Sequence, residues 1–372
     1  METVPARTVF RPRMSATRSA SPRPPLIRDA AEVISDNLQM LATAAVESHY
    51  KSDPSLQRYG ARGRARCIED AEFHLEFLLS ALAAESIGQF VDYCGWAKIL
   101  LHNRGIDVAH LADNLQHLST ALKRKLSKQQ FSIVEEYLQA GIDALPGLPT
   151  DLPSQIGPDR PYSQQANAYL KALLRFDRTE ASNIVLKESS KGTSVKDIYR
   201  HIITPVQQEI GRLWQLGKLT VVHEHYCTAA TEIVMAELFR HLVPQGAQRE
   251  LRLLAFCVEG ERHCIGIKMF ADLMSLEGWR VEYAGQDTPT SSVLRFICQE
   301  KPGVVAVSVT FAKNVRSLQT LIKAIRENPG CSGVKILIAG RAASMDLCKR
   351  LGADGYAQCV GDGVEVANRL IA

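Results

Sequence analysis

The stretch VEGERHCIGI, residues 258–267, follows the almost continuous apolar run LRLLAFC. A short apolar run of this kind predicts a buried strand of a parallel sheet. Four more candidate strands follow, RVEYAG, GVVAVSV, KILIAG and GYAQC, with helical stretches between them. These five β-α units predict a five-stranded parallel, doubly wound α/β sheet over residues 249–372.

Glu261 and His263 stand directly after the first predicted strand. Ligands of doubly wound sheets bind beyond the carboxyl ends of the strands, so this loop lies where a ligand is expected. A His in a strand-to-helix loop is usually a capping or surface residue. Neither G-x-G-x-x-G nor G-K-[ST] is present, and no further zinc ligands stand close by, which disfavours nucleotide and zinc sites.

The rest of the chain divides by composition and periodicity. Apolar residues three and four apart predict helices before the sheet, and five prolines in LPGLPTDLPSQIGPDRP predict a linker. Four long helices before the sheet predict an antiparallel bundle, interrupted at Pro205. The resulting units are a disordered basic tail (1–28), an all-helical domain (29–148), the linker (149–161), a four-helix bundle (162–245) and the sheet domain (249–372).

Charge and cysteine content exclude several functions. Residues 1–28 hold six Arg and one acid, so the tail has a net charge of +5 and the rest of the chain about −1. A neutral body predicts no nucleic-acid partner. No apolar run is long enough to span a membrane, and nine Cys without a C-x-x-C pair predict reduced thiols in a cytoplasmic protein.

Three short motifs resemble those of cobalamin-binding proteins of the methionine synthase type. They are Glu261-x-His263-x-x-Gly266, then Ser308-Val309-Thr310 after the third strand, then Ala339-Gly340 after the fourth. The resemblance covers about half of the chain and implies a flavodoxin-like, Rossmann-like sheet below a helical cap. It also implies that His263 is the lower axial ligand of the cobalt of cobalamin. Glu261 would accept the second N–H of His263, and Gly266, Ser308 and Gly340 would supply the small side chains of the crevice for the nucleotide tail. Thr310, in the second motif, belongs to the same cofactor-binding set.

The bundle carries a second resemblance, to the caps of CarH-type cobalamin photoreceptors. Trp214, Val221, Glu224 and His225 match the positions that cover the adenosyl group in that family. This resemblance implies adenosylcobalamin as the cofactor. The position after the Trp, where some members have a cobalt-capturing His, is Gln215 here, which puts a bis-imidazole photoproduct in doubt.

Together the motifs predict an adenosylcobalamin-dependent light sensor rather than an enzyme. Photolysis of its Co–C bond would change domain arrangement and oligomeric state. The expected partners are a second copy of the chain, favoured as a dimer, and a downstream signalling protein. The alternative is a corrinoid protein that shuttles methyl groups between methyltransferases. A mutase barrel does not fit in the remaining residues, and a winged DNA-reading head is not indicated.

The front helical domain resembles that of photocobilins, which implies biliverdin as a second chromophore. The residues considered for it are His74 and Tyr93 as lining, three Arg as propionate partners and Cys67 or Cys94 as a tether; the Arg are Arg62, Arg64 and Arg66. A helical dimerisation or docking domain without any ligand explains the same pattern equally well. The sequence leaves these two interpretations open.

Overall fold

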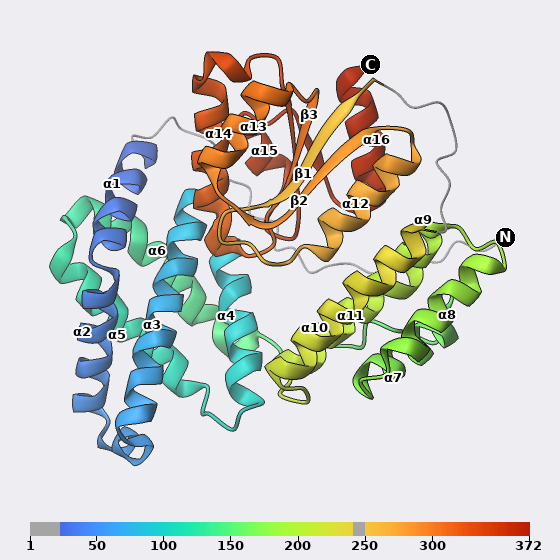
Figure 1. Ribbon diagram of the computed structural model, residues 1–372. Coiled ribbons are helices and arrows are strands. Elements are labelled where there is room, and N and C mark those ends of the chain that lie inside the picture. Colours follow the sequence, from blue (N-terminus) through green and yellow to red (C-terminus); the bar gives the residue numbers. More distant parts are fainter. Residues whose placement is uncertain (1–22, 241–249) are drawn as a thin grey trace, which may run out of the picture.

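The computed structural model describes residues 23–240 and 250–372, which form three packed bodies (Figure 1). Most of the predicted tail and the junction at 241–249 lie outside the described residues. One prediction of the tail is wrong, because a helix already begins at Arg23. Its two prolines occupy the first turn, where a backbone N–H has no intrahelical partner to lose.

The first body, the front domain, is a cluster of six α-helices joined by short turns. Ser86 and Ser127 accept hydrogen bonds from backbone N–H groups at the starts of two of them, and Ser127 with Gln130 completes a capping box. The helices share one apolar core in which Leu75, Leu78 and Leu115 are fully buried. The elements are α1 (Arg23–Asp36), α2 (Leu38–Ser52), η1 (Pro54–Tyr59), α3 (Gly60–Ala83), α4 (Ile87–His102), α5 (Ala109–Lys125), α6 (Lys128–Ala144) and η2 (Leu145–Gly147).

The second body, the cap, is the predicted helical bundle. Its third helix is interrupted before Pro205 by a π-helical segment, as expected where a proline N–H is missing from the ladder. The linker packs on the same bundle, because Glu209 accepts from the backbone N–H of Gln155 at 2.7 Å. The elements are α7 (Ser163–Leu174), α8 (Arg178–Ser190), α9 (Val195–Ile198), η3 (Tyr199–Ile203), α10 (Thr204–Gln215) and α11 (Val221–Arg240).

The third body is the predicted five-stranded parallel sheet, with strand order β2-β1-β3-β4-β5. The strands are β1 (Arg252–Val258), β2 (Arg280–Thr288), β3 (Val304–Ser308), β4 (Lys335–Ala339) and β5 (Gly355–Ala357). The central strands β1 and β3 are almost wholly buried, which explains their unbroken apolar sequence. The chain reverses its winding between β1 and β3, so the loops after these two strands flank the position where such folds bind ligands.

Helices cover both faces of the sheet (Figure 1). Two of them, α12 and α16, pack on one face, and three, α13, α14 and α15, pack on the other. Their bounds are α12 (Ile265–Leu276), α13 (Thr290–Glu300), η4 (Ala312–Asn314), α14 (Val315–Glu327), η5 (Pro329–Cys331), α15 (Met345–Leu351) and α16 (Val360–Ile371). No helix among the described residues has both the length and the apolar character needed to cross a membrane.

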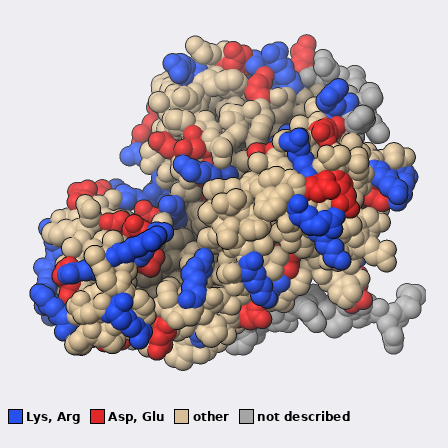
Figure 2. Space-filling view, turned by 60° about the horizontal axis from the view of Figure 1, so that its bottom comes forward, with Lys and Arg blue, Asp and Glu red and all other residues tan. Residues whose placement is uncertain are grey.

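The front domain packs against both other bodies. Its helix α3 lies against η4 and α14 of the sheet domain, where Phe77 contacts Phe311 and Glu76 pairs with Lys313 at 3.3 Å. Figure 2 shows acidic and basic side chains interspersed over one face, with a hollow between the front domain and the rest of the molecule.

Candidate functional site

The loop after β1 holds a buried carboxylate beside a half-exposed imidazole. Glu261 is fully buried, and its Oε1 lies 2.5 Å from Nδ1 of His263. The same oxygen accepts the backbone N–H of His263 at 3.0 Å. The side chain of His263 is 48% exposed, so the rest of the ring faces outward. This arrangement holds the imidazole through Nδ1, while about half of the side chain stays exposed to solvent.

The second oxygen of Glu261 is held by the loop after β3. Oε2 accepts the backbone N–H groups of Thr310 and Phe311, each at 2.8 Å, and the side-chain amide of Asn314 at 3.0 Å. The sheet brings these groups together, because β1 and β3 are hydrogen-bonded neighbours and Cys257 lies opposite Ser308 at their carboxyl ends. The carboxylate is therefore set by the two loops of the switch point.

These contacts decide the protonation of the pair. Burial alone would raise the pKa of Glu261, but hydrogen bonds from His263 and from the backbone N–H of Phe311 outweigh it and lower the pKa from 4.5 to about 2. An ionised carboxylate only accepts hydrogen bonds, so Nδ1 of a neutral His263 carries the proton. The lone pair then lies on Nε2, which leaves that atom able to bind a metal.

The residues predicted for the nucleotide crevice lie at the same edge of the sheet. Gly266 is exposed at the start of α12, with no atom within 4 Å of where a Cβ would stand. Ser308 is 5% exposed at the end of β3, and the backbone of Thr310 holds Glu261. Gly340 has a φ of +105°, and a Cβ there would lie 2.1 Å from the carbonyl oxygen of Val309. Glycine at 340 thus serves the packing of two loops, in addition to any role beside a ligand.

The residues predicted for the upper face lie on the cap at the end of α10 and the start of α11. Val221 is 50% exposed, and the side chain of His225 is 75% exposed, 3.6 Å from Glu224. The ring of Trp214 is stacked against Trp96 of the front domain, with centroids 6.3 Å apart. Because these side chains contact solvent or the front domain, their predicted contact with an adenosyl group remains a prediction.

Three contributors to the site were not predicted. Phe311 packs edge-to-face on the His263 ring at 4.6 Å, and Asn314 anchors Glu261. Gln215 is buried and donates to the carbonyl oxygen of Trp96 at 3.1 Å. A polar residue in the loop after the third strand was the available signal for Asn314. The direction of the loop backbone, which brings Phe311 into place, leaves no trace in periodicity.

The two bodies at this site match known family models. Residues 165–238 match a B12 binding domain, and residues 251–371 match a second B12 binding domain. The chain binds cobalamin. The matched segments coincide with the cap and the sheet domain, so the Glu261–His263 pair lies inside the cobalamin-binding half of the chain.

Relatives with curated names are methylamine corrinoid proteins of Methanosarcina. A dimethylamine corrinoid protein of Methanosarcina barkeri is 23% identical over 51% of this chain and 90% of that protein. Dimethylamine corrinoid protein 3 of Methanosarcina acetivorans is 24% identical over 44% of this chain and 76% of that protein. The solved monomethylamine corrinoid protein of Methanosarcina barkeri shares the fold, with a TM-score of 0.51 and 15% identity over 56% of this chain and all of that one. These relatives are corrinoid proteins rather than photoreceptors, and about half of the present chain lies outside each match.

Proposed function

We propose that this protein holds cobalamin through Nε2 of His263 and acts as a corrinoid protein that carries methyl groups between methyltransferases. The observation that supports it is the Glu261–His263 pair, in which hydrogen bonding leaves Nε2 deprotonated and directed outward. The cofactor supplies a cobalt centre that accepts and releases a methyl group. The protein's own part is to fix the imidazole, to house the nucleotide tail beside Gly266 and Ser308, and to present the upper face to partners.

The names of the relatives favour this carrier function. Both are named dimethylamine corrinoid proteins, and most of their length is matched by about half of this chain. A carrier needs no catalytic residues of its own, since the chemistry belongs to the cofactor and to the partner enzymes. We therefore place the protein among cofactor carriers rather than enzymes, with methyltransferases as its partners.

Replacement of His263 tests cobalt ligation. We expect His263→Ala to retain cobalamin at least about tenfold more weakly and to lose the spectrum of imidazole-ligated cobalt. His102→Ala is the control, because it removes an exposed imidazole from α4 of the front domain, outside the predicted site, and should leave that spectrum unchanged. Wild-type retention and spectrum in His263→Ala would contradict the assignment.

A second candidate function is the adenosylcobalamin-dependent light sensor. The observation that favours it is the packing of the front domain on both sides of the site. Trp96 stacks on Trp214 of the cap, and Phe77 contacts Phe311, which in turn packs on His263. A structural change at the upper face of the cofactor would therefore affect side chains that contact the front domain. A carrier that exposes its methyl group to enzymes does not need such a cover.

The carrier and the light sensor differ in the group that the cobalt would hold on its upper face, methyl or adenosyl. Purified protein is loaded with methylcobalamin or adenosylcobalamin, kept dark or exposed to green light, and followed by absorbance and by light scattering. A carrier prefers the methyl form and passes the group to a thiol or corrinoid acceptor. A sensor prefers the adenosyl form and changes mass or shape only after illumination.

The bilin hypothesis has weaker support. His74 is buried, its Nδ1 lies 2.5 Å from the hydroxyl of Tyr93, and burial lowers its pKa to about 4. Cys94 is also fully buried, whereas Cys67 is half-buried against Tyr50. Buried residues of a helical core form contacts of this kind without any ligand, so these contacts do not favour a bilin site. Expression with abundant biliverdin gives the answer, because a bound bilin would add a red absorbance band that disappears when residues 1–148 are deleted.

A further inference from the structure

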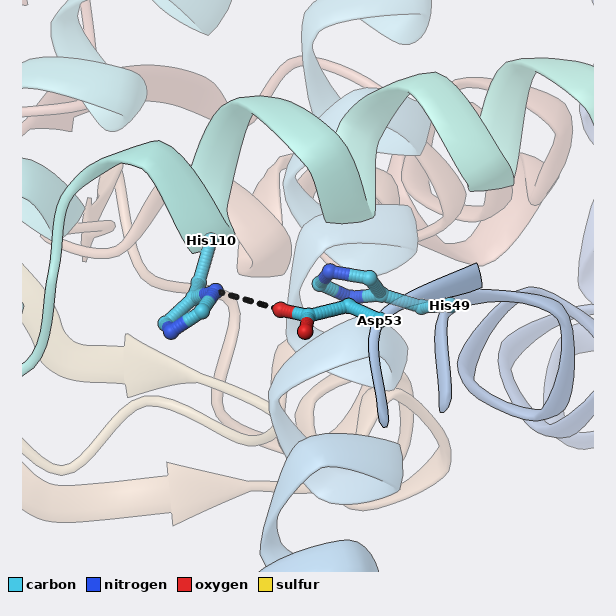
Figure 3. Close-up of side chains that lie close together, drawn as sticks. All are labelled: His49, Asp53 and His110. Atoms are coloured by element: carbon cyan, nitrogen blue, oxygen red, sulfur yellow. Dashed lines mark ion pairs between the residues drawn. The ribbon is translucent and has the colours of Figure 1, made fainter. Parts of the chain in front are cut away.

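A cluster of potential metal ligands lies in the front domain, where the end of α2, the turn after it and the start of α5 meet. His49, Asp53 and His110 each direct one ligand atom into the same space (Figure 3). These atoms lie within 4.8 Å of one another, and Nδ1 of His110 is 3.9 Å from Oδ2 of Asp53. None of the three residues belongs to the Glu261–His263 site, which lies in the sheet domain.

Two nitrogens of the cluster are buried without a hydrogen-bond partner. They are Nε2 of His49 and Nδ1 of His110, and His49 as a whole is only 5% exposed. Buried polar atoms in folded proteins are nearly always satisfied, so a pair of unsatisfied imidazole nitrogens facing one carboxylate indicates a missing ligand. A positive ion satisfies both lone pairs and the carboxylate at once.

The surrounding contacts hold the three side chains in position. Oδ1 of Asp53 accepts the backbone N–H of Ser55 at 2.9 Å, which leaves the other oxygen, Oδ2, directed toward His110. The ring of His117 stacks on His49 with centroids 5.0 Å apart, while its own Nε2 bonds Ser52 at 3.0 Å. The stacked ring restricts the rotation of His49. Asp53 and His49 are therefore restrained before any ion binds.

We propose that His49, Asp53 and His110 form a zinc site that links α2 to α5, with a water as the fourth ligand. Two neutral imidazoles and one carboxylate are a donor set that Zn²⁺ prefers, whereas Ca²⁺ and Mg²⁺ prefer oxygen alone. Tetrahedral zinc with bonds of about 2.0–2.1 Å needs ligand atoms roughly 3.3 Å apart. Small rotations of the three side chains would bring their ligand atoms, now within 4.8 Å of one another, to that separation. Asp113, with an oxygen 4.0 Å from Nε2 of His49, can accept a hydrogen bond from the bound water.

The experiment uses the untagged full-length protein, stripped with a chelator and titrated with ZnCl₂. We expect one zinc per chain by elemental analysis, together with a rise of about 5 °C in the midpoint of thermal unfolding. Asp53→Asn keeps the cap on Ser55 but removes the charged ligand, and His110→Gln removes one imidazole. Each should weaken zinc binding more than about tenfold and abolish the thermal shift.

Asp107→Asn is the matched control, because Asp107 caps the backbone N–H of Ala109 at 2.9 Å but lies outside the cluster. It should bind zinc as the wild type does. His263→Ala, which removes the proposed cobalt ligand, should also leave zinc binding unchanged and so separates the two sites. Absence of zinc binding in the wild type, or equal binding in Asp53→Asn and His110→Gln, would overturn the proposal and leave a bound water as the occupant.

Discussion

Glu261 is the residue on which the chemistry of the site depends. Five N–H groups converge on its carboxylate, two of them from His263 and the others from Thr310, Phe311 and Asn314. Hydrogen bonds to a charged acceptor are stronger than neutral ones, which offsets the cost of burying the charge. One side chain thereby orients the imidazole of His263 and joins the loops after β1 and β3.

The free energy of unfolding should depend on pH in the acid range because of the Glu261 carboxylate. A group whose pKa is lowered on folding stabilises the protein fully above its unfolded pKa and loses that effect as the pH falls toward its folded pKa. For Glu261 the two values are 4.5 and about 2, so the loss occurs between them. The total is on the order of 3 kcal/mol.

The measurement is the free energy of urea unfolding of wild type and Glu261→Gln, followed from about pH 7 to about pH 3. The difference between the two proteins should shrink as the pH falls below 4.5, because the carboxyl group of the unfolded wild type then takes up a proton while that of the folded protein stays ionised. Glu259→Gln is the control, since Glu259 makes only a long 3.4 Å contact, to the backbone N–H of Thr290. A difference that stays constant with pH would rule out the assigned role of the charge.

At the scale of elements, two loops pack so closely that only glycine fits between them. Gly340 follows β4 and lies against the backbone of Val309, which follows β3. Its φ of +105° is a conformation that other residues rarely adopt. The close approach fixes the carboxyl edge of the sheet directly beside the loop that holds Glu261.

We expect Gly340→Ala to destabilise the sheet domain by more than about 3 kcal/mol, because backbone strain and a steric clash add. Gly352→Ala is the matched control, since it has a φ of +73° but no atom within 4 Å of the added Cβ. Backbone strain alone should lower the free energy of unfolding of the Gly352→Ala variant by about 1 kcal/mol. Thermal unfolding of both variants measures the comparison, and equal losses would show that the contact with Val309 is unimportant.

The sequence was sufficient for the elements but not for their contacts. Apolar runs predicted the five-stranded sheet, and the motif around His263 predicted the cobalamin-binding half, because both are local patterns. The predicted end of the tail, at residue 28, was wrong by several residues, because prolines are tolerated in the first turn of a helix and α1 already begins at Arg23. The partners of Gln215 and Trp214 lie in the front domain, more than a hundred residues away, and no local pattern encodes such contacts.

At the scale of the whole molecule, aromatic packing holds the front domain in place. Trp96 contacts Trp214, and Phe77 contacts Phe311. The ion pair between Glu76 and Lys313 is about one-third exposed on each side, so solvent screening limits its contribution to less than about 1 kcal/mol. The aromatic contacts should therefore decide whether the front domain stays docked.

We expect Trp96→Ala to loosen the front domain while Lys313→Ala leaves it docked. The readouts are hydrogen exchange in α10, the helix that ends beside Trp214, and the radius of gyration in solution. Both should rise in Trp96→Ala, with the secondary structure unchanged by circular dichroism. If Lys313→Ala causes the larger change, charge rather than aromatic packing holds the domains together.

The segment from Phe311 to Arg316, which runs through η4 into the first turn of α14, contacts two neighbours at once. At one end it donates the Phe311 N–H to Glu261, and further along Arg316 donates to Ser35 of the front domain at 2.9 Å. Thermodynamic linkage makes such a shared segment reciprocal: if ligation at His263 shifts the loop, it must change front-domain docking by the same free energy with which docking changes ligation. Cobalamin affinity and domain docking then become two measurements of a single coupling energy. Removal of residues 1–148 would then alter cofactor retention by that amount, although the proposed cobalt ligand, His263, lies in the sheet domain.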